Sequence, residues 1–111
     1  MLHEMKLDHE PFLMIKFRTK TVEMRLYDEK RKAISIGDTI AFTDRNNGEI
    51  ALTRVKSLQT FADFTELYSC FDKTKLGYLP DEIADPRDME LYYSSSDIEK
   101  YGVIAIEIEI I

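Results

Sequence analysis

Three charged residues at close spacing are the part of the sequence best suited to chemistry: Lys20, Glu23 and Arg25. The planar fork of an arginine fits a phosphate or a carbonyl group, and a carboxylate can accept from the exocyclic amine of a base such as cytosine. A lysine neutralises phosphate or, when desolvation lowers its pKa, acts as a base. The group therefore suits either the binding of a nucleic-acid fragment or proton transfer.

A strand over about residues 20–27 must position these side chains, because apolar and polar residues alternate along it. One face carries Val22, Met24 and Leu26, and the other carries Thr21, Glu23, Arg25 and Tyr27. We predict that the apolar face packs on a core. Two interpretations of the charged face stay open. It is either an exposed Glu23–Arg25 pair worth about 0–1 kcal/mol or the lining of a cleft.

The charge distribution is uneven along the chain. The net charge of −6 argues against a general nucleic-acid coat protein, which needs an excess of basic residues. Residues 16–32, however, hold seven basic and three acidic residues, whereas residues 81–99 hold seven acidic residues and one basic residue. Such a surface can accept a small anionic partner in one place and repel long polyanions elsewhere. Alternatively, both segments are ordinary solvated surface, or the acidic one meets a basic protein partner.

The first half of the chain is predicted to be mostly strands. Alternation predicts strands at 2–7, 20–27, 39–43 and 49–58, with a helix at about 11–17 and a turn or single helical turn at 28–32. Asn47-Gly48 is the preferred dipeptide of a type I′ hairpin turn. In the strand at 49–58 we expect a core face of Ile50, Leu52, Val55 and Leu58, with a bulge between Leu52 and Val55.

The second half is predicted to be helical before a final strand. Thr60 and Asp63 resemble a capping box, and an aromatic stripe at helical spacing predicts a core-facing helix over about 61–71, with Cys70 buried beside it. A loop at 73–80 and a short helix at about 86–93 follow, and Ser96 with Glu99 forms a second capping box. Isoleucines then alternate with glutamates over 103–111, as expected of a half-buried strand.

This order of elements predicts a single domain over residues 1–111. About five strands with inserted helices fit an α+β fold built on a small mixed or antiparallel β-barrel. A doubly wound sheet would need regular alternation of strands and helices, which the sequence lacks.

Several site types and locations are disfavoured by the composition. One cysteine and two early histidines, His3 and His9, do not make a metal site, no Ser-His-Asp or Cys-His arrangement is evident, and we predict no cofactor. No apolar run approaches about 20 residues and no signal sequence is visible, so we expect no membrane association and a reducing, cytoplasmic location. The oligomeric state stays open.

The sequence resembles the ASCH (activating signal cointegrator homology) domain, a branch of the PUA-like β-barrels. The resemblance covers nearly the whole chain and is most specific at Lys20-x-x-Glu23-x-Arg25, similar to the family's Gly-x-Lys-x-x-Glu-x-Arg. Arg18 stands in the place of the family's glycine. The Ile-Gly-Asp-Thr-Ile-Ala-Phe run at 36–42 and the Tyr-Gly-Val-Ile-Ala-Ile run at 101–106 extend the likeness.

The resemblance implies a cleft beside the barrel that binds RNA or a nucleoside. The ligand-binding residues would be Arg18, Lys20, Glu23, Arg25 and Tyr27, and Tyr78, Tyr92, Tyr93 and Tyr101 offer further faces for base stacking. The family also includes ribonuclease-like members and a branch similar to N4-acetylcytidine amidohydrolases. For that branch Lys20 matches the family's lysine, Glu23 replaces its threonine, and Asp72 is the nearest candidate for its later acid. Whether the chain is an enzyme stays open.

Overall fold

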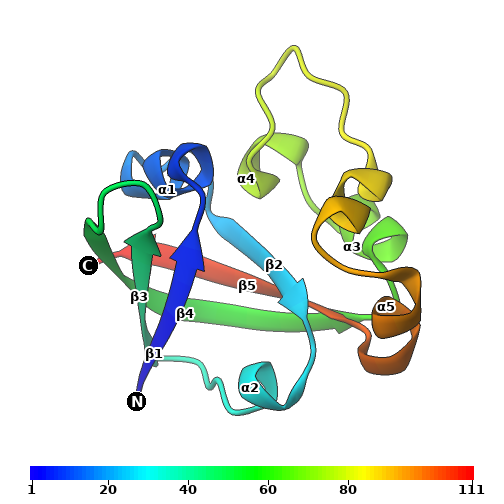
Figure 1. Cartoon of the computed structure of the whole chain (residues 1–111), viewed down its shortest axis with the longest axis horizontal. Helices are drawn as coiled ribbons and strands as arrows, with labels where there is room; N and C mark the ends of the chain where they lie inside the picture. Colours follow the sequence, from blue (N-terminus) through cyan, green and yellow to red (C-terminus); the bar gives the residue numbers. More distant parts are fainter.

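The computed structural model describes all residues 1–111, and a five-stranded mixed sheet is its framework (Figure 1). The strand order is β1-β3-β4-β5-β2; β1 runs parallel to β3 and every other neighbouring pair is antiparallel. The strands are β1 (Leu2–Leu7), β2 (Val22–Leu26), β3 (Thr39–Asp44), β4 (Ile50–Phe61) and β5 (Val103–Ile110). The sheet curls into a half-barrel. The predicted α+β barrel of about five strands is confirmed.

Short helices lie on two sides of this sheet (Figure 1). They are α1 (His9–Lys16), α2 (Glu29–Lys32), α3 (Phe64–Cys70), α4 (Lys73–Leu76), the 3-10 helix η1 (Pro86–Leu91) and α5 (Ser95–Tyr101). Helix α1 contacts β3 and β4, whereas α3, α4, η1 and α5 gather beside β2 and the start of β5. None of these helices combines the length and the apolar character needed to span a bilayer.

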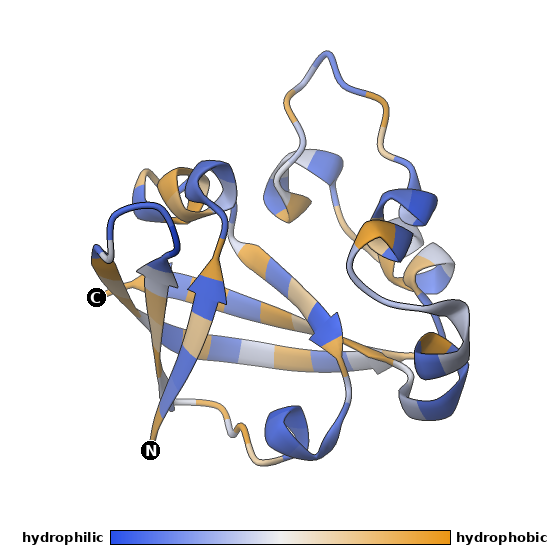
Figure 2. Ribbon diagram, in the orientation of Figure 1, coloured by the Kyte–Doolittle hydropathy of each residue, from blue (hydrophilic) through white to orange (hydrophobic).

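Two hydrophobic cores lie on opposite faces of β2 and β5. The barrel core, enclosed by the curled sheet and α1, includes Phe12, Phe42 and Ile106. The outer core, between β2, β5 and the helices after β4, includes Val22 and Phe64. Both faces of β5 are therefore buried near its start, which corrects the expectation of a half-buried strand. The alternating hydropathy along β2 in Figure 2 is consequently not an inside–outside pattern, whereas the alternation at the end of β5 does follow burial, with Ile108 buried and Glu109 exposed.

The hairpin between β3 and β4 is confirmed, but the predicted type I′ turn is wrong. That turn needs positive φ at both central residues, and only Gly48 has it, at +76°. The connection is a four-residue loop, residues 45–48, in which the Gly48 amide donates to the Asp44 carbonyl at 2.8 Å. The buried Asp44 carboxylate also accepts from the Asn46 amide at 2.8 Å and contacts His9 at 2.7 Å, which holds the longer loop in place.

The predicted core face of β4 is wrong for its first half. Ile50 and Leu52 are 60% and 48% exposed, whereas Ala51, Thr53 and Val55 are buried. Pairing with β3 decides this, because Ala51 lies opposite Phe42 on the barrel face. The bulge exists but falls later, between Val55 and Ser57.

The helix boundaries after β4 differ from the predicted ones. β4 continues through Phe61, and Asp63 caps α3 by accepting from the Glu66 amide at 2.9 Å, so Thr60 is not the cap. Helix α4 occupies part of the predicted loop at 73–80. The cap of α5 is Ser94 rather than Ser96. Cys70 is exposed, which contradicts the prediction that it is buried.

Candidate functional site

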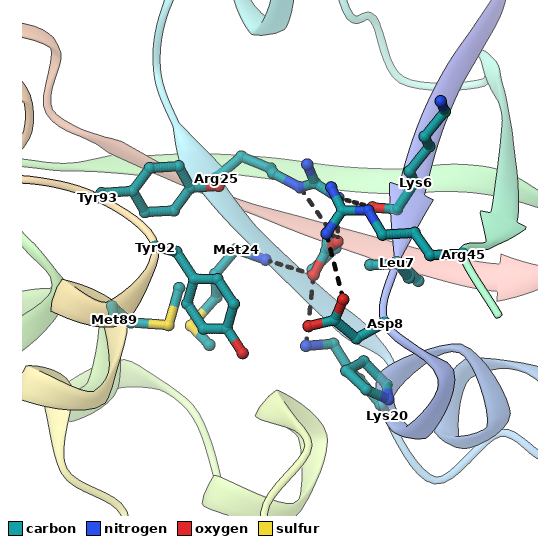
Figure 3. Close-up of a pocket in the computed structure, with 12 residues that line it drawn as sticks. Lys6, Leu7, Asp8, Lys20, Met24, Arg25, Arg45, Met89, Tyr92 and Tyr93 are labelled. Atoms are coloured by element: carbon teal, nitrogen blue, oxygen red, sulfur yellow. Dashed lines mark hydrogen bonds and ion pairs between the residues drawn. The ribbon is translucent and has the colours of Figure 1, made fainter.

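A pocket of about 270 Å³ opens where the two edge strands of the half-barrel approach each other (Figure 3). Its walls come from the end of β1 and the start of α1, from β2, from the β3–β4 loop, and from the segment at the end of η1. The lining residues are Lys6, Leu7, Asp8, Pro11, Lys20, Glu23, Met24, Arg25, Arg45, Met89, Tyr92 and Tyr93. We call this pocket the seam cleft, because no backbone pairing joins β1 to β2.

The charged face of β2 points into the barrel at the seam cleft. Glu23 lies opposite Ile106 and Arg25 lies opposite Ile104 in the antiparallel pair with β5. Directly opposite residues share a face, and both isoleucines belong to the barrel core. The interpretation of an exposed surface pair is therefore wrong: Glu23 is only 4% exposed and Lys20 only 8%.

The Glu23 carboxylate contacts protein donors through both of its oxygens. Oε1 accepts from the Met24 amide at 3.1 Å and forms an ion pair with Lys20 Nζ at 3.3 Å. Oε2 accepts from Arg25 Nε at 3.2 Å and from Arg25 Nη2 at 3.0 Å. Glu23 therefore orients its two cationic neighbours.

Arg25 links the two edge strands and still has N–H groups without a carboxylate or carbonyl acceptor. Its Nη2 donates to the Lys6 carbonyl of β1 at 3.0 Å as well as to Glu23. Nη1 is the one nitrogen of this guanidinium without a carboxylate or carbonyl acceptor. Its two N–H groups are therefore the uncommitted donors of Arg25, and the Tyr93 hydroxyl interacts with the same guanidinium.

Lys20 is held from the opposite side by α4. Its Nζ donates to the Leu76 carbonyl at 3.1 Å, and with the Glu23 contact this leaves one ammonium hydrogen uncommitted. The Lys20 side chain packs against Gly77, where an added Cβ would lie 3.1 Å from Lys20 Cδ. Gly77 also has φ +108°, which favours glycine. The end of α4 thus fixes the ammonium at the cleft.

Burial and the neighbouring charges set the ionisation of the site. Burial acts to raise the pKa of Glu23, but Lys20 and Arg25 outweigh it and the net pKa is lowered. Burial similarly opposes the charge of Arg25, and Glu23 more than offsets it, so the pKa of Arg25 is raised. Burial raises the pKa of Tyr93. The cleft therefore contains charged Glu23 and Arg25 beside a neutral Tyr93 phenol.

Two tyrosines form the wall opposite β1. Tyr93 stacks on Phe64 of the outer core, with ring centroids 6.0 Å apart, and this contact anchors the segment. Tyr92 follows the end of η1, lines the cleft and is 59% exposed. An exposed aromatic ring at the rim of a polar pocket offers a stacking face for a base.

Of the residues predicted to form the site, the structure brings Lys20, Glu23 and Arg25 together in the seam cleft. Arg18 lies outside it and lines a neighbouring hollow that shares Lys20. Tyr27 packs against the barrel core, with Lys32 Nζ 5.6 Å from its ring centroid. Asp72 lies outside both hollows and caps α4 by accepting from the Thr74 amide at 3.0 Å.

Sequence reasoning did not identify several residues of the cleft. Arg45 reaches it from the β3–β4 loop and pairs with Asp8 at 3.2 Å, and Met89 reaches it from η1. Leu76 and Gly77 support Lys20 from 56 and 57 positions along the chain. No local pattern signals such contacts. The sequence predicts only the loop at 73–80 that contains this turn.

Comparison with known proteins finds one family whose model matches this chain. The model of the family described as the ASCH domain matches residues 5–111 of the chain. None of the curated proteins compared with the chain matches it.

Solved structures with similar folds span nearly all of the chain. The hypothetical protein PH0355 has 34% identity and a TM-score of 0.85, with both chains fully covered. Protein PF0455 from Pyrococcus furiosus has 36% identity and a TM-score of 0.72, over all of this chain and 98% of that one. The S128A mutant of ZmASCH from Zymomonas mobilis has a TM-score of 0.70 at 14% identity, over 98% of this chain and 70% of that one, which supports the fold alone.

Proposed function

The chain belongs to the ASCH domain family, and on this premise we propose that its seam cleft binds the base of a nucleoside unit, either free or within RNA. The observation that carries the proposal is the group formed by buried Lys20 and Glu23 with half-buried Arg25, which opens into a cleft of about 270 Å³. Pockets for drug-sized ligands measure about 300–1,000 Å³, so this cleft suits one base with its sugar and not a stack of several.

Unused donors outnumber unused acceptors in the cleft, which indicates the kind of base edge that fits. Arg25 Nη1 and one Lys20 hydrogen remain uncommitted, whereas both Glu23 oxygens already meet protein donors. The lining includes four cationic residues and two acidic ones. Of the two lining carboxylates, only Asp8, whose side chain is 54% exposed, has an oxygen without a protein partner. A ligand group with carbonyl acceptors, such as the uracil edge, therefore matches Lys20 and Arg25 better than the exocyclic amine of cytosine does.

The test is an NMR titration of the ¹⁵N-labelled protein with uridine and cytidine up to millimolar concentration. We expect uridine to bind more tightly and to shift amides of residues 18–32 and 89–93. If no amide in these segments moves with either nucleoside, binding at this cleft is wrong.

Tyr92→Ala tests the stacking contact, because Tyr92 is exposed and the loss of its ring leaves both hydrophobic cores intact. Loss of a stacking ring weakens binding by about 1–3 kcal/mol, or roughly 5- to 150-fold. Leu91→Ala is the control: Leu91 is 84% exposed next to Tyr92 but does not line the cleft. Equal affinities of the two variants for uridine would show that Tyr92 does not contact the ligand.

The geometry supports binding better than hydrolysis. A general base needs a vacant position for the incoming proton, and the occupied Glu23 carboxylate, with its lowered pKa, is poorly suited to that role. Asp72 lies outside the cleft, so the later acid implied for an amidohydrolase has no counterpart beside Lys20 among the predicted residues. Incubation with N4-acetylcytidine and with single-stranded RNA separates the functions: turnover that Lys20→Ala abolishes would identify an enzyme.

A further inference from the structure

A second hollow of about 560 Å³ adjoins the seam cleft on the other side of Lys20. It lies between the turn after α1, the α4 segment and the paired β4 and β5 strands. We call it the basic groove, because it is lined by Arg18, Lys20, Lys56 and Lys75 together with Glu107 and Glu109. Lys20 is the residue that lines both the groove and the seam cleft, so one extended ligand can reach both.

Arg18 occupies the groove in an unfavourable backbone conformation. It directly follows Phe17, the C-cap of α1, and has φ +68°, the only positive φ of a non-glycine residue in the chain. This position after a helix strongly favours glycine, which has no Cβ to crowd the left-handed backbone. The Arg18 side chain is exposed and makes no hydrogen bond or ion pair within the protein, so no internal contact of this kind compensates for the strain.

The remaining charges of the groove leave two cations unpaired. Lys56 lies 4.0 Å from Glu109, and Lys20 is held by Glu23 and Leu76. Lys75 is exposed and, like Arg18, has no side-chain partner. The hollow is lined by four cations and two acids, and one of those cations, Lys20, is already paired with Glu23 outside the groove. The two cations without a side-chain partner, Arg18 and Lys75, are therefore the ones that can meet a phosphate group.

We propose that the basic groove binds the phosphate attached to the nucleoside in the seam cleft, through Arg18 and Lys75. The phosphate is either that of a mononucleotide or a phosphodiester of single-stranded RNA. This inference rests on the proposed function, because it requires the base to occupy the neighbouring cleft. It assigns a ligand contact to Arg18, the residue that replaces the family's glycine.

The test uses the full chain with uridine, uridine monophosphate and a uridine trinucleotide, with affinities measured at two salt concentrations. Uridine monophosphate is expected to bind about tenfold more tightly than uridine, since charge-assisted contacts to phosphate add to base binding. A further gain with the trinucleotide identifies the phosphodiester of RNA as the natural group. No further gain identifies a mononucleotide.

Arg18→Gly shows whether Arg18 contributes to phosphate binding or to the stability of the fold. It relieves the backbone strain, so the melting temperature is expected to rise, while affinity for the phosphorylated ligands falls about three- to tenfold and uridine affinity is unchanged. Lys75→Ala is expected to show the same loss of phosphate affinity with a smaller salt dependence. Lys30→Ala, an exposed cation outside the groove, is the control and should change neither affinity.

Two outcomes overturn the inference and can be told apart. If uridine binds the seam cleft, but phosphate adds no affinity and Arg18→Gly and Lys75→Ala bind all ligands as the natural chain does, the groove is not a phosphate site and the proposed function stands. If uridine, uridine monophosphate and the trinucleotide all fail to shift the amides of the cleft, the proposed function and this inference fail together.

Discussion

Glu23→Gln tests the central physical claim, that a buried carboxylate holds a buried lysine and a half-buried arginine at the seam. Gln keeps the shape of the side chain but removes its charge. The amide can replace one oxygen, and its NH₂ group then faces the donors of either Lys20 or Arg25. Removing one partner of a buried ion pair costs about 3–5 kcal/mol, because the remaining charge is left uncompensated. With one oxygen retained, we expect a loss near 3 kcal/mol.

This loss is large against the total stability. A chain of 111 residues has a free energy of unfolding of about 5–15 kcal/mol. A loss near 3 kcal/mol lowers the melting temperature by about 10–20 °C at this size. Urea unfolding at pH 7 and thermal melts followed by circular dichroism measure both quantities. Glu4→Gln is the matched control, since Glu4 is an exposed strand residue without a side-chain partner, and it should stay within about 0.5 kcal/mol.

The difference between the natural chain and Glu23→Gln should also depend on pH with a defined sign. The folded-state pKa of Glu23 is lowered from 4.5, so its contribution is fully present above that value and is lost as pH falls through the folded-state pKa. The stability gap should therefore shrink as the pH is lowered from 6 to 3. A variant that melts within about 3 °C of the natural chain at pH 7, with a gap independent of pH, would refute the argument.

Three further predictions follow from individual side chains. Gly77→Ala should destabilise the fold by more than about 1 kcal/mol in urea unfolding and weaken uridine binding, because φ +108° is strained for alanine and its Cβ would lie 3.1 Å from Lys20 Cδ; unchanged stability would contradict this. The hydrogen bond from His3 holds the pKa of Asp38 at about 2, so its contribution to stability should disappear as pH falls from about 4 towards 2; NMR titration of its carboxyl carbon measures this, and an ordinary value near 3.8 would count against the contact. Phe12→Ala should lower the free energy of unfolding by about 3–5 kcal/mol, since Phe12 is fully buried. Phe17→Ala should lower it little, because Phe17 is 66% exposed. Similar losses for the two variants in urea unfolding would show that Phe12 is not a core residue.

Sequence reasoning identified most strands, because their alternation is local. It failed where pairing overrides hydrophobicity: Ile50 and Leu52 are the more apolar residues, yet Ala51 and Thr53 face inward in β4. The pairing of β4 with both β3 and β5 sets this register. No pattern within residues 49–58 contains that information, since a one-residue slip exchanges the two faces of a strand.

For the candidate site, the sequence predicted which charged residues share a face but not the partners of each side chain. The spacing of Lys20, Glu23 and Arg25 on one strand indicated a shared face, and the ASCH resemblance favoured a cleft. The sequence could not reveal that both Glu23 oxygens already meet protein donors, because these partners depend on side-chain geometry and on the Met24 amide. Of the predicted roles, that of Glu23 as an acceptor for a base amine is consequently the one that the observed contacts favour least.

The position of the cleft follows from the way the half-barrel is closed. The edge strands β1 and β2 share no backbone hydrogen bond, so their unpaired groups need other partners at the seam. Arg25 supplies one by donating Nη2 to the Lys6 carbonyl, and Glu23 fixes the guanidinium that does so. A ligand that accepts from Nη1 would leave this closure intact, whereas a ligand that competed for Nη2 would open it. Either ligand raises the melting temperature, because each binds the folded chain. The two contacts are therefore separated by NMR: shifts of the β1 amides at residues 5–7 would indicate that the seam had been broken, and unchanged β1 amides would favour the Nη1 contact.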